Sequence, residues 1–482
     1  MKLSAEVFKD KIRYPEKVIQ FGEGNFLRAF VDWIIDEMND RNIFNGSTVV
    51  IQPLPNGMIN ILNNQDGIYT LYLQGMHEGE PVNVHKIIKS VSRALNPYED
   101  YEKFLKAAEG EEIRFVFSNT TEAGIAFDDS DTLNKIPHSS YPAKLTALLY
   151  HRFKHFKGDR SRGLIIIPCE LIDRNGEKLK KIVLKYADVW NLEAEFTKWI
   201  EESNVFCCSL VDRIVPGFPR ENIREVWEQL GYEDDLVDVG ELFHLWVIEG
   251  PAWLNEEFPA ASIGLNVKVV EDMSPYRDRK VRILNGFHTA MVPIAYLYGI
   301  DTVKEAVDNE VIGKFMKEAV FDEIIPTLNL APEECIAFAE DVVSRFRNPF
   351  IKHNLMSIAL NAMSKYDTRV LPSLLEYVNR TGKLPEKLIF SLAAYIEFYK
   401  GARGKEKINL QDEPHILELY KNLWSSYDGS YEGLEYIVKE ILAYERIWSM
   451  DLNQVPDLTK TLVNYLYVIE NKGIHEALEE FV

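Results

Sequence analysis

Cysteine is scarce in this chain, and its placement excludes two classes of protein. The four cysteines, among 482 residues, are Cys169, Cys207, Cys208 and Cys335, and no two of them form a CxxC pair. Neither a disulfide framework nor a grouping of Cys and His ligands for zinc is indicated, so we expect no metal site. The opening MKLSAEVFKD has no apolar signal core, and no run of about 18 apolar residues follows. We therefore expect a cytoplasmic protein with reduced thiols and no membrane segment.

Positive charge is also in short supply. Lys and Arg number 54 against 75 Asp and Glu, which gives a formal net charge of −21. No dense basic stripe offsets this charge, so a nucleic-acid partner or an anionic membrane surface is not expected. At 482 residues and 46% hydrophobic composition, the chain is too long for one ordinary core, and two domains are the default expectation.

The first part of the chain alternates between short apolar runs and helical stretches. The runs at 18–21, 48–51, 113–117, 164–167 and 205–210 read as buried strands. An extended region at 68–73 and 82–87 reads as an antiparallel insertion, and helical stretches lie at 101–108 and 145–156. This alternation predicts an α/β fold with a Rossmann-like, doubly wound and mostly parallel sheet.

From about residue 276 the pattern becomes helical. Apolar residues recur at helical spacing through 311–320, 355–363, 388–398 and 462–469. We therefore expect a dinucleotide-binding domain over 1–275 and a mainly α-helical substrate and catalytic domain over 276–482.

A glycine turn follows the first predicted strand. Gly22-Glu23-Gly24 comes after the apolar run at 18–21 and leads into a helix with Phe26, Leu27, Phe30 and Ile34 on its apolar side. In this context a glycine-rich turn holds a dinucleotide pyrophosphate against a helix N-terminus. Because Leu27 replaces the third glycine of GxGxxG, the turn alone is weak evidence.

The run KVRILNGFHTA carries a second candidate site. In an α-helix, Lys280, Asn285 and His288 would lie at roughly 0°, 140° and 80° around the axis, so all three can face one cleft. A lysine can transfer a proton, and an amide NH2 can stabilise a developing oxyanion. The alternative is an amphipathic helix with a solvated lysine, a capping Asn and a packed histidine.

Together the two segments resemble the polyol-specific long-chain dehydrogenase/reductase (mannitol dehydrogenase) family, which includes mannitol dehydrogenases and hexuronate-pathway reductases. That family carries a G-x-G-x-F-x-R-A turn, matched here from Gly22 to Ala29, and a K-x-x-x-x-N-x-x-H signature, matched from Lys280 to His288. Within the family, FGEGNFLRAF is most similar to the branch that reduces tagaturonate.

The resemblance implies reversible hydride transfer between NAD(H) and a keto sugar acid, tagaturonate plus NADH giving altronate. Lys280 would be the general acid and base, Asn175 and Asn285 would polarise the carbonyl, and His288 would orient the substrate hydroxyl. The family has an Asp-Asn pair after the cysteine where this chain has Glu170-Leu171, so the match around Asn175 is loose. The predicted cofactor-binding residues are Phe21, Gly22, Gly24, Asn25, Phe26, Arg28, Gln52, Asn119, Thr120, Glu122 and Asp212.

A basic segment similar to the family's R-F-x-N-P is expected to bind the substrate. Arg345, Lys352 and His353 flank Pro349, which should end any helix and gather the cations in a turn. A uronate carboxylate needs such a fixed cation, although a solvated basic face is the alternative. Lys365 and Arg369 are weaker candidates of the same kind.

The cofactor is expected to be NAD, although Gln52 stands where NAD-binding folds place Asp or Glu after the second strand. No Arg or Lys lies near Gln52 in sequence to accept the 2′-phosphate of NADP. Alternatives for the activity are fructuronate reduction and mannitol or polyol 2-dehydrogenation.

Two other classes of protein share part of these features. Tyr276 and Lys280 have the Tyr-x-x-x-Lys spacing of short-chain dehydrogenases, but those enzymes are about half this length and have another glycine pattern. A non-catalytic cofactor-binding regulator would have no reason to hold the Lys280 signature. The oligomeric state stays open.

Overall fold

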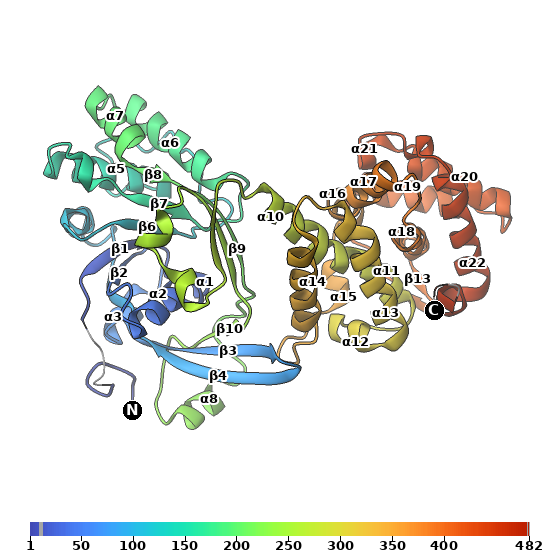
Figure 1. Cartoon of the computed structure of the whole chain (residues 1–482), viewed down its shortest axis with the longest axis horizontal. Helices are drawn as coiled ribbons and strands as arrows, with labels where there is room; N and C mark the ends of the chain where they lie inside the picture. Colours follow the sequence, from blue (N-terminus) through green and yellow to red (C-terminus); the bar gives the residue numbers. More distant parts are fainter. Residues whose placement is uncertain (9–12, 480, 482) are drawn as a thin grey trace. The chain divides into compact units, whose positions relative to one another are not determined.

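The computed structural model describes residues 1–8, 13–479 and 481, which form two compact units. Unit 1 comprises Met1–Gly75 and Val82–Met273, and unit 2 comprises Met76–Pro81 and Ser274–Val482. Figure 1 labels the elements of both units. No helix within the described part of the chain is both long enough and apolar enough to cross a membrane.

A six-stranded parallel sheet with the order β5-β2-β1-β6-β7-β8 forms the centre of unit 1. This is the strand order of doubly wound dinucleotide-binding folds, and it confirms the predicted fold class. Strands β6 and β7 are nearly continuous apolar runs because both faces of the sheet are covered. The strands of the sheet are β1 (Glu16–Phe21), β2 (Ser47–Ile51), β5 (Val91–Leu95), β6 (Phe115–Ser118), β7 (Ile165–Pro168) and β8 (Val205–Phe206).

Alternate residues of each strand enter two separate cores. On one face, Val50 lies in a buried cluster with Phe30 and Ile34. On the other face, Val49 lies in a cluster with Leu148, and α5, α6 and α7 lie along this side of the sheet (Figure 1). The helices of unit 1 are α1 (Asn25–Ala29), α2 (Val31–Asp40), α3 (Ile59–Asn64), α4 (Tyr101–Lys106), α5 (Tyr141–His155), α6 (Asn175–Val189), α7 (Ala194–Ser203), α8 (Ile223–Leu230) and α9 (Leu254–Glu257).

Two three-stranded sheets complete unit 1, with the orders β10-β3-β4 and β12-β11-β9. The extended region predicted at 68–73 and 82–87 falls on β3 and β4. The strands are β3 (Tyr69–His77), β4 (Glu80–Ile88), β9 (Cys208–Asp212), β10 (Asp238–Glu241), β11 (Leu245–Glu249) and β12 (Val267–Val270).

The single strand predicted at 205–210 is wrong. Its first residues form β8 in the main sheet, whereas β9 leaves that sheet and pairs antiparallel with β11. The apolar run VFCCSL is continuous, so nothing in its pattern marks the residue at which the chain changes sheets.

Unit 2 is almost entirely helical. The helix predicted at 355–363 is two helices, because Asn361 adopts a left-handed φ of 51° between them. A short pair, β13 (Ala402–Arg403) and β14 (Glu406–Lys407), is antiparallel. The helices are α10 (Ser274–Arg279), α11 (Gly286–Leu297), α12 (Val303–Asp308), α13 (Glu310–Glu318), α14 (Pro332–Phe346), α15 (Leu355–Ile358), α16 (Ala362–Arg369), α17 (Leu371–Thr381), α18 (Glu386–Phe398), α19 (Pro414–Ser425), α20 (Tyr431–Leu442), α21 (Glu445–Trp448) and α22 (Leu458–Glu479), with π-helical segments η4 (Lys280–Asn285) and η5 (Ala319–Ile324).

Helix α11 lies at the centre of unit 2 and packs against α13, α15, α16 and α18. Pro293 lies inside α11, so it provides no N–H for the carbonyl of Thr289 one turn earlier. The hydroxyl of Tyr395 on α18 donates to that carbonyl at 2.8 Å. This hydrogen bond satisfies the orphaned acceptor and anchors the helix that follows the Lys280 segment.

Candidate functional site

The glycine turn after β1 has the geometry that a pyrophosphate requires. Gly22 has a φ of 121°, its N–H donates to Ile51 O at 3.0 Å, and a Cβ there would lie 3.1 Å from Asn119 O. Gly24 is exposed, and a Cβ on it would meet no atom within 4 Å. The first glycine therefore permits a tight crossing between strands, and the second leaves the backbone open to a ligand. Phe21 is fully buried at the end of β1. The turn fits a dinucleotide.

The helix predicted after this turn is interrupted. Phe30, with φ −126° and ψ −75°, separates the five-residue α1 from α2. Phe26 is half-buried, and its ring stacks on that of Phe30 with centroids 5.0 Å apart. Leu27, Phe30 and Ile34 are buried as predicted, so the apolar side survives the break.

Arg28 lies behind the turn and not at its opening. The side chain is 1% exposed, and its guanidinium donates to Glu23 O at 3.1 Å, Leu236 O at 2.6 Å and Asn25 Oδ1 at 2.7 Å. Its Nη2 also lies 3.6 Å from Asp238 Oδ2. Burial raises the pKa of Asp238 to about 7, although Arg28 opposes the shift. Arg28 and Asn25 thus hold the turn against β10, a positioning role in place of the predicted cofactor contact.

At the end of β2, Gln52 is buried and shapes the following loop. Its Nε2 donates to Leu54 O at 2.8 Å and Pro55 O at 3.2 Å. Glu23 reaches the same loop from the β1 side, where its Oε1 accepts from Met58 N at 3.4 Å. Burial raises the pKa of Glu23, and the backbone N–H groups and Arg28 oppose this shift. The sequence gives no sign of this role, because Glu23 stands there only as the middle residue of the Gly22–Gly24 turn.

The loops after β6 and β7 are joined by a buried carboxylate. Glu170 is 2% exposed and accepts from Ser118 Oγ at 3.0 Å and from both the N–H and the hydroxyl of Thr120 at 2.9 Å. Burial raises its pKa. Asn119 is half-buried and Glu122 is exposed, so both can be reached by a ligand at this edge of the sheet. Glu170 was noted in the sequence only as a departure from the family pattern.

The catalytic role predicted for Asn175 is not supported by its surroundings. The side chain is fully buried, and its Nδ2 lies within hydrogen-bonding distance of three carbonyls, those of Pro168, Glu170 and Ser209. Its Oδ1 accepts from the N–H groups of Gly176 and Ser209, both at 2.9 Å. With every polar atom bonded to the backbone, Asn175 ties α6 to the ends of β7 and β9.

Asp212 ends β9 and is buried, opposite Leu245 of β11. The next residue, Arg213, lies under α2 with its guanidinium 4.1 Å from the ring of Trp33. Burial lowers the pKa of Arg213 to about 9. The predicted contact of Asp212 with the cofactor stays a prediction.

In unit 2, the Lys280 signature lies on a π-helical segment. The segment η4 runs from Lys280 to Asn285 and continues directly into α11. In such a helix each N–H bonds the carbonyl five residues earlier, so Lys280 and Asn285 lie about one turn apart on the same side of the helix. The angles predicted for an α-helix are therefore wrong for this pair. Both side chains are half-buried, and their alignment along one side is closer than an α-helix would give.

His288 lies three residues beyond Asn285 and is held by aromatic contacts. Its ring stacks on Phe346 with centroids 4.1 Å apart and meets the ring of His353 edge-on at 4.9 Å. Burial, together with the positive charges of Arg345 and Arg369, lowers the pKa of His288 well below its usual value. The imidazole is therefore neutral at pH 7. Its buried Nε2 has no hydrogen-bond partner among the residues that the structure describes.

The basic residues predicted to bind substrate divide into two groups. Arg345 lies in the last turn of α14, which ends at Phe346 before Pro349 as predicted. Arg345 and Arg369 both act electrostatically on His288, so they form a positive region around it. Burial lowers the pKa of His353, so its imidazole adds no charge at pH 7. Lys352 is exposed.

Lys365 and Arg369 lie on α16, close to the start of α11. Lys365 donates to Ile358 O at 2.8 Å, and burial lowers its pKa and that of Arg369. A Cβ on Gly286 would lie 3.1 Å from Arg369 O, so the end of α16 adjoins the end of η4. Arg369 thus gains a place beside His288 that its sequence position, 24 residues beyond Arg345, does not reveal. In the described ranges, no three His, Cys, Asp or Glu side chains are grouped as metal ligands would be.

Two family models match the chain. Residues 16–261 match the mannitol dehydrogenase Rossmann domain, and residues 272–469 match the mannitol dehydrogenase C-terminal domain. The chain belongs to the mannitol dehydrogenase family. As a member of this family it is an oxidoreductase acting on CH–OH groups.

Relatives named altronate oxidoreductase match over nearly the full length. The protein from Bacillus subtilis (strain 168) is 50% identical over 480 residues, which cover 100% of this chain and 98% of the relative. The protein from Phocaeicola vulgatus is 51% identical and that from Escherichia coli O6:K15:H31 is 48% identical, each with 97% of both chains covered.

Solved structures of the family share the fold at low sequence identity. A D-sorbitol dehydrogenase in substrate-free form has a TM-score of 0.81 at 21% identity, covering 99% of this chain and 100% of its own. A mannitol 2-dehydrogenase of Pseudomonas fluorescens, in a ternary complex with NAD and D-mannitol, has a TM-score of 0.65 at 20% identity, covering 100% and 99%. At these identities the likeness concerns the fold.

Proposed function

We propose that this chain catalyses the reversible reduction of D-tagaturonate to D-altronate with NADH. The observation that carries the proposal is the identity of 48–51%, over at least 97% of the chain, to relatives named altronate oxidoreductase. Two features of the structure support it. The backbone of the glycine turn in unit 1 is open to a dinucleotide, and in unit 2 Arg345 and Arg369 act electrostatically on His288, three residues beyond Asn285.

The nicotinamide cofactor, when bound, supplies the hydride, and the protein supplies position and proton transfer. The amine of Lys280 donates a proton to the carbonyl oxygen of the sugar acid in reduction and removes it from the hydroxyl in oxidation. The amide of Asn285, aligned with Lys280 along η4, donates to the same oxygen as negative charge develops there. Asn175 is left out of this mechanism because its amide is already bonded to the backbone.

His288 orients the substrate. Because its imidazole is neutral, one ring nitrogen is an acceptor and the other a donor. The buried Nε2, unpartnered among the described residues, is suited to a hydroxyl of the sugar chain. Stacking on Phe346 fixes the plane of the ring and therefore the direction of that hydrogen bond.

The positive region around His288 favours an acidic substrate over a neutral polyol. Arg345 and Arg369 carry permanent charge, and a guanidinium can hold a carboxylate through two parallel hydrogen bonds. We assign the carboxylate of the sugar acid to this region, with Lys352 and His353 at its margin. Fructuronate carries the same group, so it is the alternative substrate.

The test is NADH oxidation by the purified protein with tagaturonate, fructuronate and fructose measured side by side. Turnover of tagaturonate with the highest kcat/KM is the expected result. Preference for fructuronate would keep the mechanism and change the substrate. Preference for fructose would contradict the role given to Arg345 and Arg369, and no turnover of any of the three would contradict the proposal.

A further inference from the structure

The loop after β2 lacks the acidic residue that usually binds the adenosine ribose, and its glutamine is committed elsewhere. In doubly wound folds an Asp or Glu at this position accepts from the ribose 2′-hydroxyl of NAD. Here the amide hydrogens of Gln52 go to Leu54 O and Pro55 O, the carbonyls of its own loop. Gln52 is 2% exposed. Its amide hydrogens are therefore used within the loop.

The turn that follows the neighbouring strand β1 brings a carboxylate to the loop after β2 instead. Phe21 at the end of β1 pairs with Ile51 at the end of β2, so the residues that follow both strands meet at one edge of the sheet. A Cβ placed on Gly57 would lie 2.1 Å from Glu23 Oε1 and 2.4 Å from Gln52 Oε1. The loop therefore places Gly57 directly on these two side chains, so the carboxylate of Glu23 lies beside Gln52, the residue that stands where such folds have their acid.

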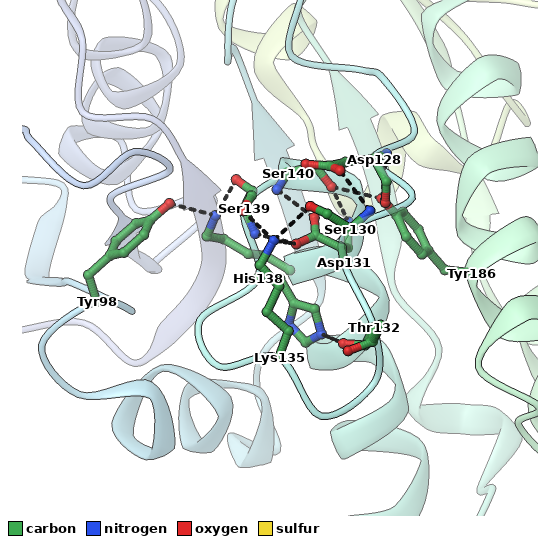
Figure 2. A network of polar contacts seen from close by, with 12 residues as sticks. Tyr98, Asp128, Ser130, Asp131, Thr132, Lys135, His138, Ser139, Ser140 and Tyr186 are labelled. Carbon is green, nitrogen blue, oxygen red and sulfur yellow. Dashed lines mark hydrogen bonds and ion pairs between the residues drawn. The ribbon is translucent and has the colours of Figure 1, made fainter.

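A polar network supports the loop that follows β2. Tyr98 OH donates to Pro53 O at 3.3 Å and accepts from Lys144 Nζ at 3.1 Å. Figure 2 shows Tyr98 at one end of this network, with Asp131 and Ser139 at its centre. Lys144 is fully buried and also donates to Ser139 O at 2.8 Å. Its charge is thus enclosed behind the loop and cannot meet a phosphate on the ligand side.

We propose that Glu23 accepts the adenosine ribose 2′-hydroxyl and makes the chain selective for NAD over NADP. A carboxylate accepts from a hydroxyl, but it is repelled by a 2′-phosphate, which carries negative charge and offers no donor. The inference rests on the proposed function only in taking the glycine turn as a dinucleotide site. It does not depend on which sugar acid is reduced.

The experiment measures the dissociation constants of NADH and NADPH for the full chain by isothermal titration calorimetry, without substrate. The wild type is expected to bind NADH at least about tenfold more tightly, the factor that one charge-assisted hydrogen bond can contribute. Glu23→Gln should reduce this preference by about tenfold, chiefly by weakening NADH and strengthening NADPH. Glu99→Gln, which removes an exposed carboxylate after β5, should leave the preference unchanged.

Glu23→Asp keeps the charge and shortens the reach, so it should weaken NADH while NADPH stays excluded. This variant also provides a result if Glu23→Gln does not fold. Equal weakening of both cofactors by Glu23→Gln, or loss of selectivity in Glu23→Asp, would overturn the inference and leave the proposed function intact. A wild type that binds neither cofactor would overturn both.

Discussion

One asparagine and one histidine in unit 1 have very different surroundings from one asparagine and one histidine in unit 2. In unit 1, Asn175 is bonded to the backbone through both side-chain atoms, and His244 Nε2 accepts from Asn266 N at 2.9 Å. In unit 2, Asn285 is only half-buried, and His288 Nε2 has no partner among the described residues. Both histidines are kept neutral, since burial lowers the pKa of His244 to about 3 and that of His288 well below its usual value.

The comparison distinguishes residues that hold the fold in place from residues that are left able to bind a ligand. A buried polar atom without a partner costs free energy, so a fold retains one where something else gains from it. The saturated pair in unit 1 holds strands and loops in place, whereas the open pair in unit 2 retains hydrogen-bonding capacity for a ligand. Among the cations, Arg28 donates to carbonyls of its own unit, whereas Arg345 and Arg369 act electrostatically on His288.

The largest expected effect on activity is that of replacing Lys280. Lys280→Ala should lower kcat by a factor of about 10² to 10⁴, the range for a positioned proton-transfer group. Steady-state NADH oxidation with tagaturonate measures this. Lys405→Ala, at an exposed lysine of the β13–β14 turn, is the control and should leave kcat unchanged. A Lys280→Ala enzyme with near-normal turnover would remove the proton-transfer role.

The next effect is at Asn285. Asn285→Ala should lower kcat by about a hundredfold, as the loss of one oxyanion donor does, with little change in KM. The free energy of unfolding, measured with urea, should change by no more than about 1 kcal/mol, because the side chain is only half-buried. A stability loss as large as that expected below for Asn175 would show that Asn285 is scaffold too.

Asn175→Ala should have the opposite effect, a loss of stability with little change in kcat. The change leaves buried carbonyl and N–H groups without partners, so the free energy of unfolding should fall by about 2–3 kcal/mol. The folded fraction should retain a kcat close to that of the wild type, measured at a temperature where the variant is folded. A stable but inactive variant would instead restore the carbonyl-polarising role that the sequence suggested.

Most of the fold could be predicted from the sequence, because the spacing of hydrophobic residues indicates the strands and helices. Four of the six strands of the main sheet coincide with short apolar runs, and the change to helical spacing occurs near residue 276. The strand β5 was missed because VSRAL places Ser92 and Arg93 in its middle, and these polar residues interrupt the apolar pattern.

The site is less accessible to such reasoning, since it depends on hydrogen bonds made in three dimensions. The identities of Lys280, Asn285 and His288 are visible in the sequence, but the π-helical turn that aligns the first two is a property of backbone bonding. Asn175 and Asn285 are the same residue type beside a glycine in both cases, and only their partners distinguish them. Glu23 and Arg369 gain their positions from neighbouring elements that are distant along the chain.

The smallest expected effect concerns the neutral histidines and appears as a pH dependence of stability. Both have a folded-state pKa below the value of about 6.5 that applies in the unfolded chain. Above pH 6.5 neither state binds the proton, and the stability is fully present. As the pH falls below 6.5, the unfolded state binds protons that the folded state does not bind. The free energy of unfolding therefore decreases by up to about 1.4 kcal/mol per pH unit for each histidine.

His288→Gln should therefore reduce the loss of stability between pH 6.5 and 5.5, measured by urea unfolding at each pH. His77→Gln, at an exposed histidine, should leave the pH dependence as in the wild type. The two neutral histidines should then differ in one respect. At pH 7.5, His244→Gln should lower the stability more than His288→Gln does. In the first variant Asn266 N loses its acceptor, whereas the second loses ring contacts with Phe346 and His353 but no hydrogen bond of Nε2 to a residue that the structure describes. Equal losses at pH 7.5 would mean that His288 is as much a part of the scaffold as His244.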